Sequence, residues 1–410
     1  MTSLSPDVVI IGGGIGGGTM ATVLAGSGLE VIVLERETIY PDRVRGEWIA
    51  PWGVAEFKRL GLLNLLYENG AIHVERNVSY DENWSPDVAE QRALDFTKLL
   101  PEIPGPLCIG HPTMCNVFSA SAKAADAEVL NGVKEIEVAA GTRPIVSFSS
   151  NGTSVSLKPR LVIGADGRNS IVRKQLGFPV LADEPHNLLG GLLVANVPDW
   201  PRHVQALGTE DKFHYLVFPQ GKDMVRLYAC YDFADRTKFT GPDREARLLQ
   251  AFRLNCLPYA EAILGGTPVG SFNSYSNEDH WVDDPTTAGI VLIGDAAGHN
   301  DPVTGQGLSI VARDVRIVSD ILVSTKDWDQ IDLAPYVDER RERMRRLRIA
   351  GRLATKIRVE FGDDARERRA RVSQRALERQ LSPLLATLIG PERLPPEAYT
   401  PETIEKLIGP

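Results

Sequence analysis

Short apolar runs alternate with glycine-rich and polar stretches along the first part of the chain. Residues 7–11 are Asp-Val-Val-Ile-Ile, and a second run of this kind, Glu-Val-Ile-Val-Leu, occupies residues 30–34. Runs this short and this rich in β-branched side chains predict buried strands. The segment between them, Thr19 to Ala25, is predicted as a helix that ends near Gly26. The pattern therefore predicts a strand–helix–strand unit.

Two later apolar runs, at 161–163 and 291–293, lead in a similar way into an acidic residue and glycine. A helix is predicted to begin at Ser170 after the first run, and another helix is predicted to follow Gly307 after the second. Three predicted strands thus end in glycine-containing turns, and two of these turns also contain an acid. Glycine at such turns marks places where the backbone approaches another group closely.

The middle of the chain has a different pattern. Residues 188–197, 213–218 and 224–231 are rich in β-branched and aromatic side chains and are bounded by Pro, Gly and Asp, which predicts an antiparallel sheet. Alternation places Tyr215 on one face and His214 on the other. One face is expected to cover the bound molecules, and the alternation does not decide which.

Residues 331–410 are predicted to be helical and rich in arginine. Apolar residues three or four positions apart form one stripe of a long helix. The stripe consists of Met344, Leu347, Gly351, Ala354, Ile357 and Phe361. We predict that the arginines lie on the outer, solvated face of this helix and pair with glutamates; a surface for an anionic partner is the alternative.

Composition limits the class of protein. The chain has 410 residues, of which 43% are hydrophobic and 24% charged, and this predicts a globular protein of about two domains. A net charge of -9 argues against nucleic acid as a partner, and no apolar run reaches the roughly 18 residues of a membrane span. Four cysteines without metal-type spacing predict neither a disulfide framework nor a metal site. We therefore expect a cytoplasmic protein, monomeric or homodimeric, that acts on a small molecule.

The first turn carries a dinucleotide-binding fingerprint. Gly12, Gly14 and Gly17 fit the spacing G-x-G-x-x-G between strand and helix, where one glycine makes a tight turn, one admits a pyrophosphate and one allows close packing. Glu35 ends the second strand, where an acid accepts a hydrogen bond from a ribose hydroxyl. The predicted cofactor site also includes Ile15, Gly16 and Arg36. The fingerprint alone does not separate a nicotinamide dinucleotide from a flavin dinucleotide.

The other two glycine–acid turns narrow this choice. They contain Asp166-Gly167 and Gly294-Asp295. Together with the first fingerprint, and in this order, they resemble the three motifs of the flavin-dependent monooxygenases of the para-hydroxybenzoate hydroxylase group. The resemblance implies FAD as the cofactor, with NADPH or NADH as a transient reductant.

The resemblance also implies roles for single residues. In that group the acid of the Gly-Asp motif contacts the ribityl chain, a position that corresponds to Asp295 beside Gly294. The residues that line the isoalloxazine ring correspond to Pro302, Gly305, Gln306 and Gly307. Asp166 corresponds to the acid near both the FAD pyrophosphate and the nicotinamide nucleotide, and it also fits a cap of the following helix.

Two further segments supply candidate residues. Arg45 corresponds to an arginine that reaches the flavin, and a solvated loop position is the alternative. Glu47 follows two residues later, either near the ring or at the surface. His111 corresponds to a polar residue on the ribityl chain, with local capping or packing as the alternative.

The resemblance implies an α/β fold (α+β overall), in which a Rossmann-like FAD-binding domain is interleaved with an antiparallel-sheet substrate domain and followed by helices. The three turns must converge on one FAD, so the FAD-binding domain is expected to be discontinuous. We assign residues 1–75, 105–180 and 286–330 to the FAD-binding domain, 76–104 and 181–285 to the substrate domain, and 331–410 to the C-terminal helices.

The expected reaction also follows from the resemblance. NAD(P)H reduces FAD, O₂ adds to form the C4a-hydroperoxide, and this hydroxylates or epoxidises an aromatic or polyketide-like small molecule. The candidate substrate residues are Glu47, His214, Tyr215 and Tyr228. No side chain is assigned a catalytic role.

Three alternatives remain open. A flavin-dependent halogenase shares the first fingerprint, but the Trp-x-Trp-x-x-Ile-Pro string typical of halogenases does not occur. A reductase of the geranylgeranyl reductase type carries Tyr-x-Trp-x-Phe-Pro; Phe218 and Pro219 match it, whereas His214 and Leu216 replace its tyrosine and tryptophan. A flavin-binding protein without enzymatic activity is the third alternative.

Overall fold

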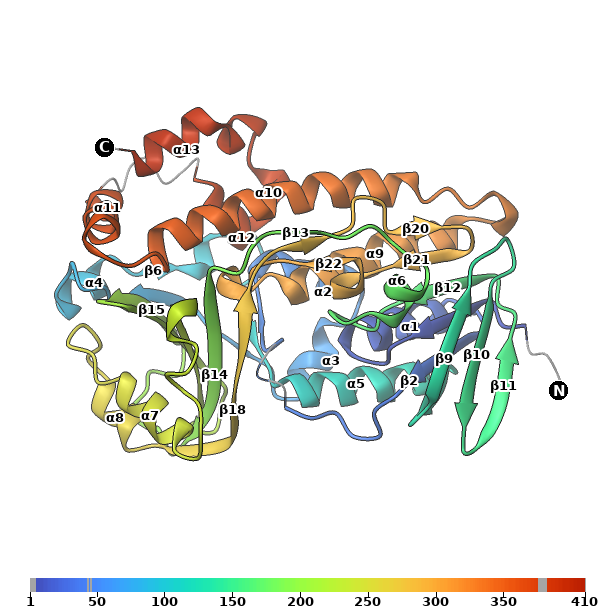
Figure 1. Cartoon of the computed structure of the whole chain (residues 1–410), viewed down its shortest axis with the longest axis horizontal. Helices are drawn as coiled ribbons and strands as arrows, with labels where there is room; N and C mark the ends of the chain where they lie inside the picture. Colours follow the sequence, from blue (N-terminus) through green and yellow to red (C-terminus); the bar gives the residue numbers. More distant parts are fainter. Residues whose placement is uncertain (1–4, 43, 45, 375–381, 410) are drawn as a thin grey trace.

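The structure, a computed structural model, describes residues 5–42, 44, 46–374 and 382–409. Two large sheets lie beside each other, and one long helix runs across both (Figure 1). Helices and sheets contribute throughout, so the predicted α/β class, α+β overall, is confirmed. Among the helices of the described residues, none is both long and apolar enough to cross a membrane.

The first sheet has six strands in the order β20-β21-β12-β1-β2-β8, and every neighbouring pair is parallel except β20 with β21. In chain order the strands are β1 (Val8–Ile11), β2 (Val31–Glu35), β8 (Glu128–Asn131), β12 (Leu161–Gly164), β20 (Thr286–Thr287) and β21 (Ile290–Leu292). Both faces of its central strands are covered, which explains why these strands are apolar throughout.

Different elements cover the two faces of this sheet. Three helices pack on one face, and a small antiparallel sheet packs on the other. The helices are α1 (Ile15–Gly26), α5 (His111–Ala124) and α9 (Gly307–Ser324), and the small sheet consists of β9 (Lys134–Ala139), β10 (Ile145–Ser150) and β11 (Thr153–Leu157). Helix α1 begins at Ile15 and not at Thr19 as predicted, because the last glycines of the fingerprint form its first turn.

The parallel register brings the three glycine–acid turns together. Strands β1, β12 and β21 are adjacent, with Ile11 opposite Gly164 and Gly164 opposite Leu292. Their carboxyl ends therefore reach the same edge of the sheet, where doubly wound folds bind ligands. The predicted convergence of the turns is present although the turns are far apart in the sequence.

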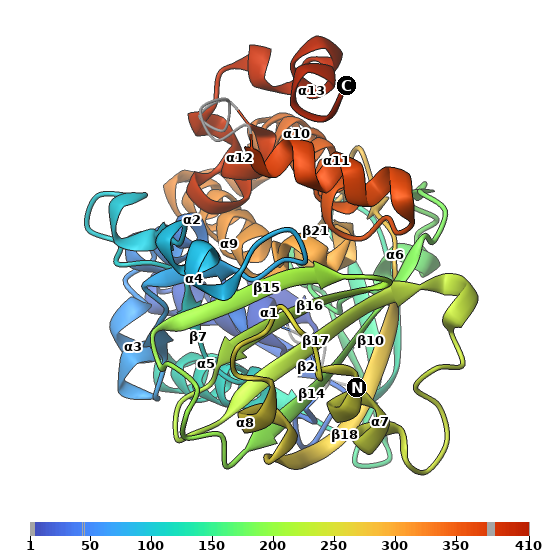
Figure 2. The same cartoon turned by 90° about the vertical axis from the view of Figure 1, so that its left-hand side faces the viewer.

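The second sheet has seven strands in the order β18-β14-β17-β16-β15-β5-β6 and forms the front of the view in Figure 2. In chain order these are β5 (Arg76–Ser79), β6 (Leu94–Asp95), β14 (Asn187–Ala195), β15 (Val204–Glu210), β16 (Phe213–Pro219), β17 (Val225–Asp232) and β18 (Thr267–Asn277). The predicted antiparallel pairing is present, and only the added contact between β15 and β5 is parallel. The division of the chain into domains stays a prediction.

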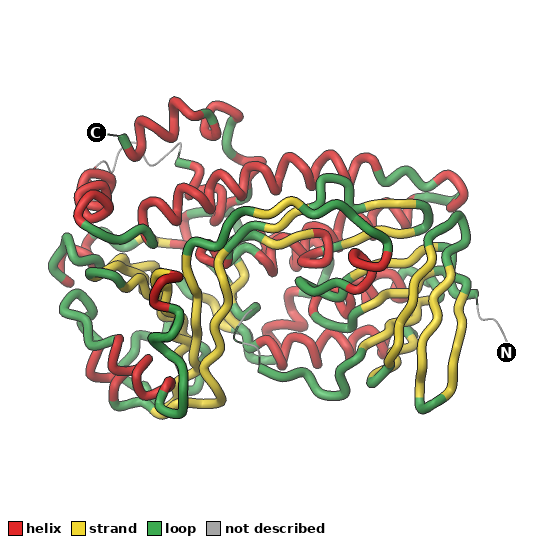
Figure 3. The backbone as a smooth tube through the Cα atoms, viewed as in Figure 1, coloured by secondary structure: helices red, strands yellow, loops and turns green. Residues whose placement is uncertain are grey.

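The C-terminal helices gather along one side of the molecule, over the two sheets (Figures 1 and 3). They are α10 (Ala334–Arg358), α11 (Asp363–Gln374), α12 (Pro383–Ile389) and α13 (Pro401–Ile408). The prediction that the arginines of the long helix face outward is wrong for Arg340 and Arg343, which are buried. The predicted stripe is also too long, because Phe361 lies beyond the end of α10.

Candidate active site

One cavity of about 770 Å³ extends from the carboxyl edge of the six-stranded sheet to the seven-stranded sheet. Its volume lies within the range of about 300–1,000 Å³ that is usual for ligand sites. The predicted residues that line it are Gly12, Gly14, Ile15, Gly16, Glu35, Arg36, Glu47, His111, Asp166, His214, Tyr228, Gly294, Asp295, Pro302, Gly305, Gln306 and Gly307. Gly17 and Tyr215 are not part of the lining, and Arg45 lies outside the described residues.

Each of the three fingerprint glycines lacks a side chain for a different structural reason. Gly12 has φ +100°, and a Cβ there would lie 2.5 Å from the carbonyl oxygen of Ala165. A Cβ at Gly17 would lie 1.8 Å from the carbonyl oxygen of Gly12, so only glycine lets α1 pack on the turn. Gly14 has no atom within 4 Å of such a Cβ, although it lines the cavity. Its missing side chain therefore leaves room for a ligand.

Glu35 holds the glycine turn in place from the neighbouring strand. Its carboxylate accepts hydrogen bonds from the backbone N–H of Gly13 at 2.6 Å and of Glu37 at 2.7 Å. Each carboxylate oxygen has a second lone pair, which leaves capacity for a ribose hydroxyl. The Arg36 side chain is 63% exposed and pairs with Glu37 at the edge of the cavity.

Asp166 is both a helix cap and a cavity residue. Its Oδ2 accepts hydrogen bonds from the N–H groups of Ile171 (2.6 Å) and Val172, at the start of α6 (Ile171–Gln175). Its Oδ1 is buried without a hydrogen-bond partner among the described residues, and burial raises the pKa of the carboxyl group. The capping alternative is therefore correct, and one oxygen is still left for a ligand.

Arginines of α10 contact the Gly-Asp loop and the helix that follows it. Asp314 of α9 accepts a 2.8 Å hydrogen bond from the N–H of Gly294 and pairs with Arg340 at 3.2 Å and Arg343 at 2.6 Å. Arg340 also donates to the carbonyl oxygens of Gly294, Ala297 and Gly298. We call Asp314, Arg340 and Arg343 the arginine clamp. Sequence reasoning missed it, because charged residues are most often solvated.

The turn that follows Asp295 is shaped by the long loop before α9. Gly305 has φ +65°, and a Cβ there would lie 2.9 Å from the Trp48 ring. The side chain of Gln306 is engaged by the protein: it accepts a hydrogen bond from Trp52 Nε1 at 2.9 Å and donates to the carbonyl oxygen of Thr387 at 3.1 Å. These contacts fix the orientation of the Gln306 amide at the cavity wall. His111 is the first residue of α5, with its ring against Gly46.

A buried ion pair lies beside the cavity, whose wall includes Glu47 and Tyr228. Arg226 donates from Nη2 to Glu47 at 2.6 Å and to Asp42 at 2.8 Å, and the Tyr228 hydroxyl donates to Glu47 at 3.0 Å. Burial raises the pKa of Glu47, while its contact with Arg226 opposes the shift. Glu47 is therefore not a surface carboxylate. Arg226 was missed as a functional residue, although alternation places it on the same face as Tyr228.

The two adjacent candidates His214 and Tyr215 lie on opposite faces of β16. The Tyr215 hydroxyl donates to the carbonyl oxygen of Tyr80, and its ring packs against Phe252 in the core. The prediction of Tyr215 as a substrate residue is therefore wrong, because the face with His214 lines the cavity.

His214 has a defined tautomer. The Thr209 hydroxyl donates to the carbonyl oxygen of Arg358 at 2.8 Å, so it has to accept the 2.9 Å hydrogen bond from His214 Nδ1. The proton of the neutral ring thus lies on Nδ1. Burial lowers the pKa of His214 to about 3, and Arg358 and Arg369 add to this effect.

The glycine turn, the capped acid and the clamped Gly-Asp loop meet at one cavity and form a site of the kind that binds a dinucleotide. The chain belongs to the family described as "FAD binding domain", whose model matches residues 5–349. The residues present fit FAD, because Gly14 leaves an open cradle and the buried Asp166 Oδ1 and Thr304 Oγ1 have no hydrogen-bond partner among the described residues. The match shows this family; membership in the para-hydroxybenzoate hydroxylase group, which is a narrower class, stays a prediction.

Individual proteins resemble the chain at low identity. Squalene monooxygenase of Rattus norvegicus is 25% identical over 347 residues, which cover 78% of this chain and 55% of that protein. The chain thus spans about half the length of the first curated relatives it matches. The structure of p-nitrophenol 4-monooxygenase PnpA from Pseudomonas putida DLL-E4 matches with a TM-score of 0.77 and 19% identity over 95% of this chain and 99% of that chain. The flavin-dependent halogenase CmlS matches with a TM-score of 0.74 and 18% identity over 90% and 70%. These structures share the fold.

Two glycine substitutions separate folding from cofactor binding. We expect Gly17→Ala to lower the free energy of unfolding of the FAD-free chain by about 3 kcal/mol, because the new methyl group overlaps the backbone of Gly12. Gly14→Ala meets open space and should change it by less than about 0.5 kcal/mol while weakening FAD binding. Chemical denaturation and FAD titration measure the two effects. Equal destabilisation by both substitutions would contradict this account.

The arginine clamp predicts a long-range effect on FAD binding. Arg340→Met should destabilise the chain by about 3 kcal/mol and raise the FAD dissociation constant, because Asp314 and three loop carbonyls lose a buried partner. Arg341→Ala is the matched control, since Arg341 is exposed on the same helix and pairs with Asp338. An unchanged FAD affinity in Arg340→Met would show that the clamp does not position the loop.

The lowered pKa of the buried His214 predicts that the folded chain loses stability in acid. The folded chain keeps His214 neutral down to a pKa of about 3, whereas the unfolded chain protonates it below 6.5. Its contribution is therefore present above pH 6.5 and is lost as the pH falls towards 3. His214→Phe should reduce the stability difference between pH 7 and pH 5 by about 2 kcal/mol. Denaturation at both pH values tests this, with the exposed His203→Phe as a control that should behave like the unsubstituted chain.

Proposed function

We propose that the protein is an FAD-dependent monooxygenase that uses NADPH or NADH and O₂ to hydroxylate or epoxidise a small organic molecule. The observation that carries the proposal is one shared cavity. The glycine–acid turns line one part of it, and apolar side chains line another part, which we call the apolar chamber. The relation to squalene monooxygenase and the fold shared with p-nitrophenol 4-monooxygenase support this reaction class. Bound FAD would supply the reduction of O₂ and the oxygen transfer.

The apolar chamber suits an aromatic or polyketide-like substrate. Its lining includes Leu189, Leu216 and Phe218 of the seven-stranded sheet, Leu384 and Leu388 of α12, and Phe96 in the short helix that follows β6. Such walls exclude water from the reacting groups, which protects a reactive oxygen species from side reactions. Polar positioning would come from His214 and Tyr228, which lie on the same face of the sheet.

The cofactor residues are assigned by their positions around the turns. Gly12, Gly14 and Glu35 would hold the adenosine and pyrophosphate parts of FAD, and Asp295 would accept a ribityl hydroxyl. The backbone at the start of α9 would face the polar edge of the flavin ring, since a helix N-terminus favours negative charge.

A reductase of the geranylgeranyl reductase type is the second candidate. It is favoured by one observation. His214, Leu216 and Phe218 stand where the Tyr-x-Trp-x-Phe-Pro motif has its tyrosine, tryptophan and phenylalanine, and all three line the cavity. A halogenase gains no such support, because the fold shared with CmlS is common to the other neighbours and the halogenase tryptophan motif does not occur in the chain.

Anaerobic mixing with NADPH or NADH, followed by ¹⁸O₂, tests the proposal. Trials with 2-naphthol and with squalene represent aromatic and alkene substrates. A monooxygenase bleaches the flavin absorbance, consumes one NAD(P)H per product and places one ¹⁸O atom in the product. Reduced product formed without O₂ would instead establish the reductase. Failure of both nicotinamides to reduce the flavin, with and without these compounds, would overturn the monooxygenase proposal.

A further inference from the structure

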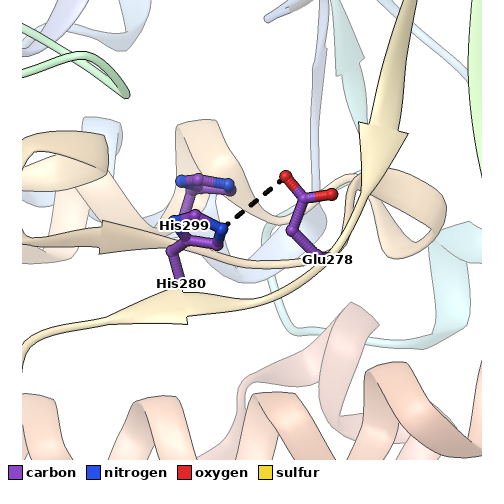
Figure 4. A group of neighbouring side chains, drawn as sticks. All are labelled: Glu278, His280 and His299. Carbon is purple, nitrogen blue, oxygen red and sulfur yellow. Dashed lines mark ion pairs between the residues drawn. The ribbon is translucent and has the colours of Figure 1, made fainter. Parts of the chain in front are cut away.

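Two histidines and a glutamate converge beside the Gly-Asp loop. His280 on β19 (His280–Trp281) and His299 on β22 (Gly298–His299) are direct partners of an antiparallel pair. Directly opposed residues share one face of a sheet, and the two rings stack with centroids 4.7 Å apart. Glu278, two residues before His280, points its carboxylate toward both rings (Figure 4).

The polar atoms of this group are poorly satisfied by the protein. His299 is 6% exposed, and neither ring nitrogen has a hydrogen-bond partner among the described residues. The buried Oε2 of Glu278 also has none there, and Oε1 lies 3.7 Å from His280 Nε2. Buried polar atoms without partners are unfavourable. A bound group that accepts a lone pair from His299 and one from Glu278 would remove part of this cost.

We propose that Glu278, His280 and His299 bind one divalent transition-metal ion, for which Zn²⁺ is the probe. One ligand atom of each residue lies within 4.8 Å of the other two. Bonds of about 2.0–2.2 Å to one ion require a closer approach. Rotation of His280, which is about one-third exposed, and of Glu278 provides it.

The donor set and the surrounding charges select the class of ion. Two imidazole nitrogens and one carboxylate suit zinc and similar metals, whereas magnesium and calcium require mainly oxygen donors. Arg168 lies nearby and repels cations, but it is paired with Asp295 at 3.5 Å. The repulsion from Arg168 would exclude a weakly bound cation such as magnesium. A transition-metal ion bonded directly to two histidine nitrogens would bind in spite of this repulsion.

The proposed ion would join two parts of the fold. β22 belongs to the loop that carries Asp295, and β19 continues the chain from β18 of the seven-stranded sheet. His299 also lines the cavity. The ion would therefore brace the Gly-Asp loop in addition to the arginine clamp, without taking part in the proposed oxygen transfer.

The test uses the FAD-loaded full chain, freed of metal by a chelator and titrated with Zn²⁺ by calorimetry. We expect one ion per chain with a micromolar or lower dissociation constant, and a dissociation constant at least 100-fold higher in Glu278→Gln and in His280→Ala. His203→Ala is the matched control, because His203 is an exposed histidine 3.9 Å from Glu75. It should bind Zn²⁺ like the unsubstituted chain.

Two further measurements keep the outcome decisive. The flavin absorbance and far-ultraviolet circular dichroism of each variant establish that it is folded and loaded. Co²⁺ in place of Zn²⁺ should give visible bands that His280→Ala lacks. No stoichiometric binding, or binding that all four proteins share equally, overturns the metal site and leaves the monooxygenase proposal unaffected, because none of these readouts depends on turnover.

Discussion

The conformation of the Gly-Asp loop depends on Asp314, which is buried between two arginines. One carboxylate faces two guanidinium groups, and Arg340 uses its other hydrogens on three carbonyl oxygens of the Gly-Asp loop. Charges withdrawn from water are tolerated only when their partners are complete. Loss of either arginine would leave the buried carboxylate of Asp314 under-paired, so the long C-terminal helix α10 helps to fix the position of the loop.

The parts of the fold that could be predicted from the sequence are those with a local cause. Val8–Ile11 and Leu161–Gly164 are buried on both faces, so they appear as unbroken apolar runs. Gly12 and Gly17 were predictable because a tight turn and a close helix contact each exclude a side chain. Asp166 follows the same logic, since a short polar side chain before a helix caps it.

The remaining features are set by tertiary contacts that no local pattern encodes. Alternation separated His214 from Tyr215, but only the packing of Phe252 and Tyr80 shows that the tyrosine faces the core. Arg340 and Arg343 look like solvated helix residues until Asp314, from another helix, is placed beside them. Gln306 lines the cavity, but no local pattern shows that its amide is also hydrogen-bonded to Trp52 and Thr387, which are 254 and 81 residues away.

The parallel order of β1, β12 and β21 and the position of the clamp have a consequence for biosynthesis. The first glycine turn leaves the ribosome early, but the loop that completes the cavity is held by a residue near position 340. The nascent chain therefore carries the dinucleotide fingerprint long before the arginine clamp can form. If the clamp is needed to hold the loop, flavin incorporation is expected to follow the docking of α10, after all six strands of the sheet have been made.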